Sequence, residues 1–195
     1  MPIPTEVYRG DGRAPDILEG DRGFSAWSPL TIDEAREMVQ LFTRLRSLNQ
    51  CSFKDRGQRV ILPDVVRGDP DSLHTPDSLK ELIIRSGRSR ESFWVSTETT
   101  QGGGGMGGGY IYEIPTANLQ LVSWDRVNVD LRPRQLWPEL YTDTGDLDNA
   151  NAIALYNAMG DTKELSYLTN ITCPQIQGWK LASADPSEPF APTGW

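Results

Sequence analysis

Short runs of apolar, aromatic and β-branched residues recur along the chain, and glycine, proline and aspartate residues separate them. Runs of this composition and length are typical of β-strands. Strands are predicted at residues 5–9 (TEVYR), 92–97 (SFWVST), 110–114 (YIYEI), 164–168 (ELSYL) and 175–182 (QIQGWKLA). The second and third runs are predicted to be antiparallel neighbours, because a single glycine-rich connection joins them.

Apolar residues with helical spacing predict three helices in addition to these strands. The first begins at Thr31, which opens a capping box, and the second spans 75–87. The third is predicted over 148–160, where Ile153 and Tyr156 belong to one apolar stripe.

The order of these elements is helix-rich early and strand-rich late, without regular strand and helix alternation. This order predicts an α+β domain built on antiparallel sheets rather than a doubly wound nucleotide-binding fold. With 195 residues, of which 37% are hydrophobic, the chain suits one domain, residues 1–195. Its last part, about 183–195, is predicted to be a proline-rich tail.

The formal net charge of −8 disfavours nucleic acid as the main partner, because binding to phosphate backbones relies on basic surfaces. The apolar runs are too short for a membrane span. The N-terminal residues MPIPTEVYRGDG also lack the hydrophobic region of a signal peptide.

Several common kinds of site are disfavoured. Cys51 and Cys173 match no zinc motif, and they are equally compatible with one long-loop disulfide or two buried thiols. The scattered aspartates do not reproduce the spacing of a calcium loop, so no metal site is predicted. The only histidine, His74, lies in a loop-like stretch, which leaves serine or cysteine nucleophiles without an obvious base.

The glycine-rich stretch 102–109 is a poor phosphate cradle. Dinucleotide-binding glycine motifs need a helix directly after them, whereas a predicted strand follows here. We therefore expect a surface loop, which could face a substrate.

Three polar elements could carry chemistry, although each also has a plainer interpretation. Arg9 ends a strand just before a turn, where its planar fork could hold a phosphate, brace a neighbouring strand or form a surface ion pair. Ser96 and Thr97 alternate faces, so one hydroxyl could enter a cleft while the other points away. Glu164 could stabilise an oxocarbenium-like sugar or be a solvated glutamate.

Taken with their flanking residues, these elements resemble the motifs of bacterial mono-ADP-ribosyltransferases of the cholera and pertussis toxin type. The matching segments are VYRGDGRAPDILEGDRGFSAW (7–27), FWVSTETT (93–100) and KELSYLTNITCPQIQGWK (163–180). They occur in the family's order and span most of the chain. The resemblance implies a single ADP-ribosyltransferase-like domain, with antiparallel sheets around an NAD cleft and helices packed outside.

The resemblance also implies residue roles, with NAD as a substrate and no metal. Arg9 would contact NAD phosphate or ribose, Ser96 would order the arginine and the glutamate, and Glu164 would hold the nicotinamide ribose. The further positions expected to line or shape the cleft are Asp11, Arg13, Trp27 and Thr97. The acceptor would be a macromolecule, protein rather than nucleic acid. The enzyme would act as a secreted or delivered toxin or effector in a target cell's cytoplasm, within a larger toxin or through a secretion system.

Two positions depart from the family pattern. Thr162 stands two residues before Glu164, where the family has a glutamate or glutamine that helps to select the acceptor. Glu81 aligns with a family histidine, whereas His74 lies earlier. The acceptor therefore stays open, and two alternatives remain: an NAD glycohydrolase, for which water is the acceptor, and a catalytically silent interaction module.

Overall fold

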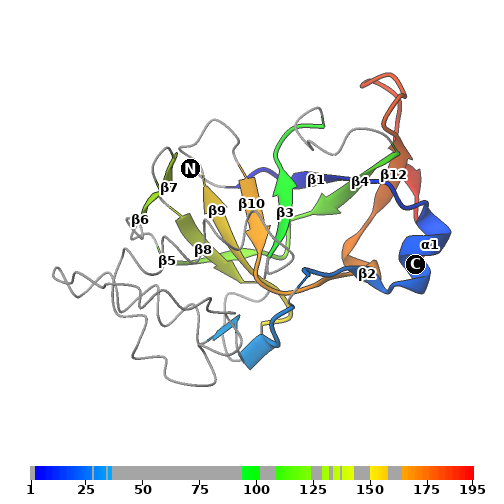
Figure 1. The fold of residues 1–195 in the computed structure, drawn as a ribbon. Helices are drawn as coiled ribbons and strands as arrows, with labels where there is room; N and C mark the ends of the chain where they lie inside the picture. The colour runs from blue at the N-terminus through cyan, green and yellow to red at the C-terminus, as the bar shows by residue number, and fades with distance from the viewer. Residues whose placement is uncertain are drawn as a thin grey trace, which may run out of the picture.

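The computed structural model of the chain describes residues 3–27, 29–33, 35–36, 94–101, 109–123, 129–131, 134–136, 138–142, 150–157 and 164–195. Strands dominate these residues, and every pair of strands in them is antiparallel (Figure 1). The antiparallel architecture that the sequence predicts is therefore confirmed.

Most of the strands belong to one sheet. Its members are β1 (Glu6–Asp11), β3 (Val95–Glu98), β4 (Tyr110–Pro115), β5 (Gln120–Ser123), β8 (Pro138–Thr142), β9 (Ile153–Asn157), β10 (Glu164–Tyr167), β12 (Gly178–Leu181) and β13 (Ala191–Pro192). Their order is β13-β12-β4-β1-β3-β10-β9-β8-β5. Two small sheets accompany it, formed by β2 (Gly23–Phe24) with β11 (Ile171–Thr172) and by β6 (Val129–Leu131) with β7 (Arg134–Leu136).

The main sheet changes direction between β1 and β3. β1 pairs with β4 along its whole length, from Glu6 opposite Pro115 to Asp11 opposite Tyr110. With β3 it shares the single register position at which Tyr8 lies opposite Glu98. In Figure 1, β1 runs from side to side, whereas β3 and β10 run up and down the view. The backbone ladder between β1 and β3 is therefore short, and side chains complete the connection.

The core lies on one face of this sheet. The strands contribute fully or almost fully buried side chains there, namely Val7, Val95, Tyr112, Ile114, Ala154, Leu165 and Tyr167. Leu18, Phe24 of β2 and Ile171 of β11 pack against these side chains. The Phe24 ring meets the Tyr112 ring edge-on. Burial of these large apolar side chains is the main stabilising contribution to the fold.

Helices are few in the residues described. Helix α1 (Pro15–Gly20) follows the turn after β1 and was not predicted. Pro15 occupies its first turn, where proline is favoured, and Leu18 is its buried residue. A short 3₁₀ helix, η2, spans Cys173–Gln175. The predicted helix at Thr31 does begin there, because the Ala35 amide donates to the Thr31 carbonyl at 2.9 Å.

The rest of the helix predicted from Thr31, after Arg36, and the helix predicted over 75–87 fall on residues outside the described part of the chain. No helix in the part of the chain that the structure describes has the length and apolar character needed to cross a membrane.

The predicted helix over 148–160 is wrong. Residues 153–157 form β9, which pairs with β8 on one side and β10 on the other. Ala152, Ile153 and Ala154 are all fully buried. A short apolar run that is buried all round fits an interior strand as well as a helix, so its periodicity alone cannot separate the two.

Two further predictions need correction. The runs that became β3 and β4 are not neighbours, because β1 lies between them. No strand was predicted in the polar stretch after β5, which contains β6, β7 and β8. Both errors concern pairing between distant segments, which local composition does not encode.

The proline-rich C-terminal segment packs against the main sheet. β13 pairs with β12, and the Phe190 ring stacks on the Tyr8 ring at a centroid distance of 5.7 Å. Lys180 is buried, and its ammonium donates to the carbonyl oxygens of Asp185 (3.4 Å), Pro186 (3.0 Å) and Glu188 (3.1 Å). The segment is therefore an integral part of the domain.

Candidate functional site

Arg9, Ser96 and Glu164 lie on three neighbouring strands. Arg9 belongs to β1, Ser96 to β3 and Glu164 to β10, in the sheet order β1-β3-β10. Ser96 lies directly opposite Ser166, and Glu164 lies directly opposite Glu98. Residues that are far apart in the sequence are thus brought together by strand pairing.

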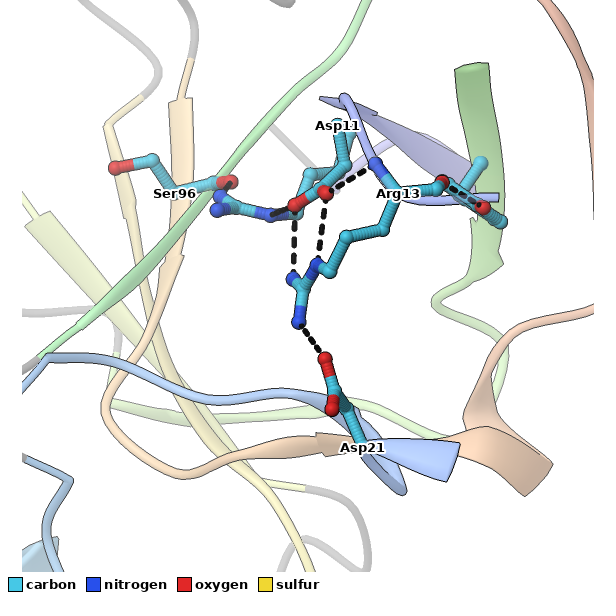
Figure 2. A network of polar contacts seen from close by, with 6 residues as sticks. Asp11, Arg13, Asp21 and Ser96 are labelled. Carbon is cyan, nitrogen blue, oxygen red and sulfur yellow. Dashed lines mark hydrogen bonds and ion pairs between the residues drawn. The ribbon is translucent and has the colours of Figure 1, made fainter. Parts of the chain in front are cut away.

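A side chain links β1 to β3 where their backbone ladder ends. Arg9 Nη1 donates a hydrogen bond of 2.7 Å to the backbone carbonyl oxygen of Ser96. Figure 2 shows the Ser96 hydroxyl pointing away from this polar network. The contact thus uses the main chain of Ser96, and its hydroxyl remains on the other side.

The Arg9 guanidinium is held in a largely buried position. It lies over the Phe24 ring at 5.0 Å, and its Nε is 3.9 Å from Asp11 Oδ2. This Nε is buried and has no hydrogen-bond partner among the described residues. Burial lowers the pKa of Arg9, and the charge of Arg13 acts in the same direction, whereas the negative charges of Asp11 and Glu164 oppose the change. The group stays cationic at neutral pH and retains a donor for an additional acceptor.

Arg13 and Asp11 form a fork-to-fork ion pair beside Arg9. Arg13 Nε and Nη2 donate to the two Asp11 oxygens at 2.8 Å each, and Arg13 Nη1 donates to Asp21 at 2.8 Å (Figure 2). Burial raises the pKa of Asp11, but the hydrogen bonds and charge of Arg13, with the charge of Arg9, outweigh it and hold the pKa below its usual value. The pair fixes the turn after β1, because planar bidentate contacts are strongly directional.

Tyr112 and Phe24 complete the surroundings of this pair. The Tyr112 hydroxyl donates to the Arg13 carbonyl at 2.6 Å, and the Arg13 guanidinium lies 5.5 Å from the Phe24 ring centroid. Core aromatic residues therefore position both arginines.

Ser96 and Thr97 occupy opposite faces of β3, as strand alternation predicts. Thr97 is buried, and its hydroxyl donates to the Leu165 carbonyl at 2.7 Å, so it binds β3 to β10 on the core side. Ser96 is partly exposed on the other face, opposite Ser166.

Ser166 contacts Glu164 and was not singled out from the sequence. Its hydroxyl donates to Glu164 Oε1 at 2.8 Å. A signal was available, because residues two apart in a strand share a face and the segment resembles a Glu-x-Ser motif. Ser166 therefore orients the carboxylate of Glu164.

Glu98 is a second glutamate at the site that sequence reasoning missed. It lies opposite Glu164 on one side and opposite Tyr8 on the other. Burial raises the pKa of Glu98, and the negative charge of Glu164 raises it further. Its position two residues after Ser96 could have indicated that the two share a face.

The remaining predicted positions are not all described. Trp27 follows β2, and 71% of its surface is exposed. Thr162, His74, Glu81, Cys51 and the glycines at 102–108 lie outside the described residues.

Gly109 is described, with φ of +122° and a backbone packed so closely on Asp11 that a Cβ atom would lie 2.5 Å from the Asp11 carbonyl oxygen. The end of the glycine run is thus fixed against the turn that carries Asp11 and Arg13.

The described residues contain no group of three or more histidine, cysteine, aspartate or glutamate side chains arranged to hold a metal ion. Compared with models of known families and with curated protein sequences, the chain matches none.

Proposed function

We propose that this chain is a mono-ADP-ribosyltransferase, which cleaves NAD at the bond between nicotinamide and ribose and transfers ADP-ribose to a macromolecule. The observation that carries the proposal is the 2.7 Å bond from Arg9 to Ser96, with Glu164 on the next strand. The bond joins the Arg9 and Ser96 motifs directly, and the Glu164 motif is connected to them through the pairing of β3 with β10.

Arg9 suits the binding of an anionic or hydroxyl-rich substrate. Its guanidinium is fixed by Ser96 and Phe24, while Nε has no hydrogen-bond partner among the described residues. A preorganised guanidinium binds phosphate with charge-assisted hydrogen bonds and loses little side-chain entropy in doing so. We assign to it the NAD phosphate or the adjoining ribose.

Glu164 suits the stabilisation of positive charge on a sugar. When nicotinamide leaves, C1′ of the ribose becomes oxocarbenium-like, and a carboxylate held nearby lowers the energy of that state. The bond from Ser166 fixes one carboxylate oxygen and leaves the other available for the ribose. Ser96 shares this face with Ser166, which supports its assignment to the same site.

The finer parts of the proposal rest on the resemblance. They are an ADP-ribosyltransferase-like domain with an NAD cleft, a protein acceptor, and action as a toxin or effector inside a target cell. The second candidate is an NAD glycohydrolase. Thr162 favours it, because threonine is a poor base and a poor mimic of the carboxylate or amide that would select an acceptor.

The test uses NAD labelled in its adenylate part, incubated with the protein in the presence and absence of a cell lysate. A transferase labels a macromolecule in the lysate, whereas a glycohydrolase releases nicotinamide and free ADP-ribose only. Labelling should be lost in Glu164→Gln and retained in Glu113→Gln, a matched glutamate on β4. Absence of both labelling and nicotinamide release from the wild type would refute the proposal.

A further inference from the structure

Glu98 faces Glu164 directly across the β3–β10 pair. Opposite residues of antiparallel strands project from the same face, with Cβ atoms about 5 Å apart. Glu98 therefore shares its face with Glu164, Ser166 and Ser96. On its other side it faces Tyr8, where β1 and β3 share their single register position.

No positive charge or hydrogen-bond donor among the described residues compensates Glu98. The Tyr8 hydroxyl donates to Glu6 instead, at 2.7 Å, and burial together with that bond raises the pKa of Tyr8 to about 12, so it is neutral. The titratable groups of the described residues on this face nearest to Glu98 are Tyr8 and Glu6 on β1 and Glu164 on β10. Beyond β1, the face continues to Glu113 on β4 and Lys180 on β12. A like-charged pair directly opposite in a sheet is destabilising, so a stability role does not explain Glu98.

Glu113 provides a contrast within the same sheet. It lies opposite Tyr8 on β4, on the same face as Glu98 and with β1 between them. Burial raises the pKa of Glu113 too, and the negative charge of Glu6 adds to this, but the positive charge of Lys180 lowers it. On Glu98, the negative charge of Glu164 acts without such an opposing positive charge. Both glutamates therefore lie opposite Tyr8, but only Glu98 is on a strand next to that of Glu164.

We propose that Glu98 is a second catalytic carboxylate, which accepts the proton of the nucleophile that attacks the ribose. This inference rests on the proposed function. In the step, the bond from C1′ to the nicotinamide nitrogen breaks, and nicotinamide leaves with the electron pair. A lone pair of the acceptor's oxygen or nitrogen then forms the new bond to C1′, and the acceptor's proton passes to the Glu98 carboxylate.

The two carboxylates have different tasks in this scheme. Glu164 is held by Ser166 and stabilises the cationic ribose, for which it must stay ionised. Glu98 has no such bond from the described residues, and its raised pKa makes it a better base than an ordinary glutamate. The substrate class implied is an acceptor that attacks as a neutral, proton-bearing nucleophile, water included.

The experiment measures steady-state nicotinamide release as a function of pH for the wild type, Glu98→Gln, Glu98→Asp and Glu113→Gln, with water as acceptor. Glu98→Gln should lower kcat about 100-fold and change KM for NAD less than about twofold, because a general base acts after binding. The acid limb of the kcat profile should disappear in Glu98→Gln. Glu98→Asp should recover part of the rate, and Glu113→Gln should behave as the wild type.

Other outcomes separate this inference from the proposed function. A wild-type rate in Glu98→Gln, or a fall equal to that of Glu113→Gln with the acid limb retained, overturns the role of Glu98 and leaves the proposed function standing. If Glu98→Gln does not fold, a Glu98→Asp profile identical to that of the wild type overturns the role as well, since a displaced base must slow the step. A folded wild type that releases no nicotinamide overturns both.

Discussion

Arg9 and Ser96 are 87 residues apart in the sequence, yet Arg9 Nη1 donates to the Ser96 carbonyl at 2.7 Å. The bond occurs where the β1–β3 ladder ends, so one side chain connects β1 to β3, and β10 with Glu164 is the next strand of the sheet. The connection between β1 and β3 and the proposed binding of NAD therefore depend on the same residue.

Arg9→Lys should destabilise the fold and weaken the proposed binding of NAD. Lysine lacks the planar fork, so the Ser96 carbonyl loses its donor, and we expect a loss of about 1.5–3 kcal/mol in the free energy of unfolding. Urea denaturation measures this loss. Arg22→Lys is the control, because the Arg22 side chain is exposed, and substitutions at such surface positions change stability by about 0.5 kcal/mol or less. Equal losses in the two variants would contradict the role of Arg9.

Gly23→Ala should be among the most damaging small substitutions in the domain. Gly23 has φ of +107°, and a Cβ atom would lie 2.1 Å from the Ile171 carbonyl oxygen. Because the contact is with backbone of β11, we expect a loss of about 3 kcal/mol or more, measured by thermal unfolding. Gly20→Ala, with open space around its Cβ, should leave the melting temperature unchanged or raise it. A melting temperature of Gly23→Ala close to that of the wild type would show that β2 and β11 do not pack as described.

Lys180→Met should loosen the C-terminal segment. The substitution keeps the apolar stem but removes the ammonium that donates to three carbonyl oxygens and lies over the Phe190 ring at 4.7 Å. The loss should be about 2–4 kcal/mol, with faster proteolysis after β12. Unchanged proteolysis and stability would mean that the pairing of β13 with β12 and the stacking of Phe190 on Tyr8 hold the segment without Lys180.

Glu98→Gln should stabilise the protein at neutral pH while it lowers activity. The pKa of Glu98 is raised by burial and by Glu164 from 4.5, so the folded state binds its proton more tightly than the unfolded state does. The stability this gives is present below pH 4.5 and is lost as the pH rises through the folded pKa. At pH 7 the variant should gain about 0.2–1 kcal/mol, limited by solvent screening, and at pH 4 the gain should largely vanish. Thermal melts of the wild type and Glu98→Gln at both pH values measure this gain. A stability gain that is larger at pH 4 than at pH 7 would contradict a raised pKa of Glu98.

The sequence was most informative where local composition decides the structure. β1, β3, β4, β10 and β12 fall within or beside the predicted strands, because their aromatic and β-branched residues fit a half-buried sheet. The alternation of Ser96 and Thr97 was predictable for the same reason, since side chains in a strand alternate between faces.

Pairing was not predictable in this way. β1 separates β3 from β4, and β9 replaces a predicted helix, because contacts between distant segments set both features. Two residues of the site were missed for a related reason. Ser166 lies opposite Ser96, and Glu98 opposite Glu164, because of the register of β3 with β10, which local composition does not encode. A one-residue shift of that register would have separated the Ser96 and Glu98 face of β3 from the Glu164 and Ser166 face of β10.

The central claim, that this arrangement cleaves NAD, is tested most directly by nicotinamide release from purified wild type and from Glu164→Gln. We expect nicotinamide release by the wild type that falls at least about 100-fold in Glu164→Gln, with NAD binding largely retained through Arg9. Glu113→Gln should match the wild type. No release by a folded wild type, or equal release by wild type and Glu164→Gln, would contradict the account.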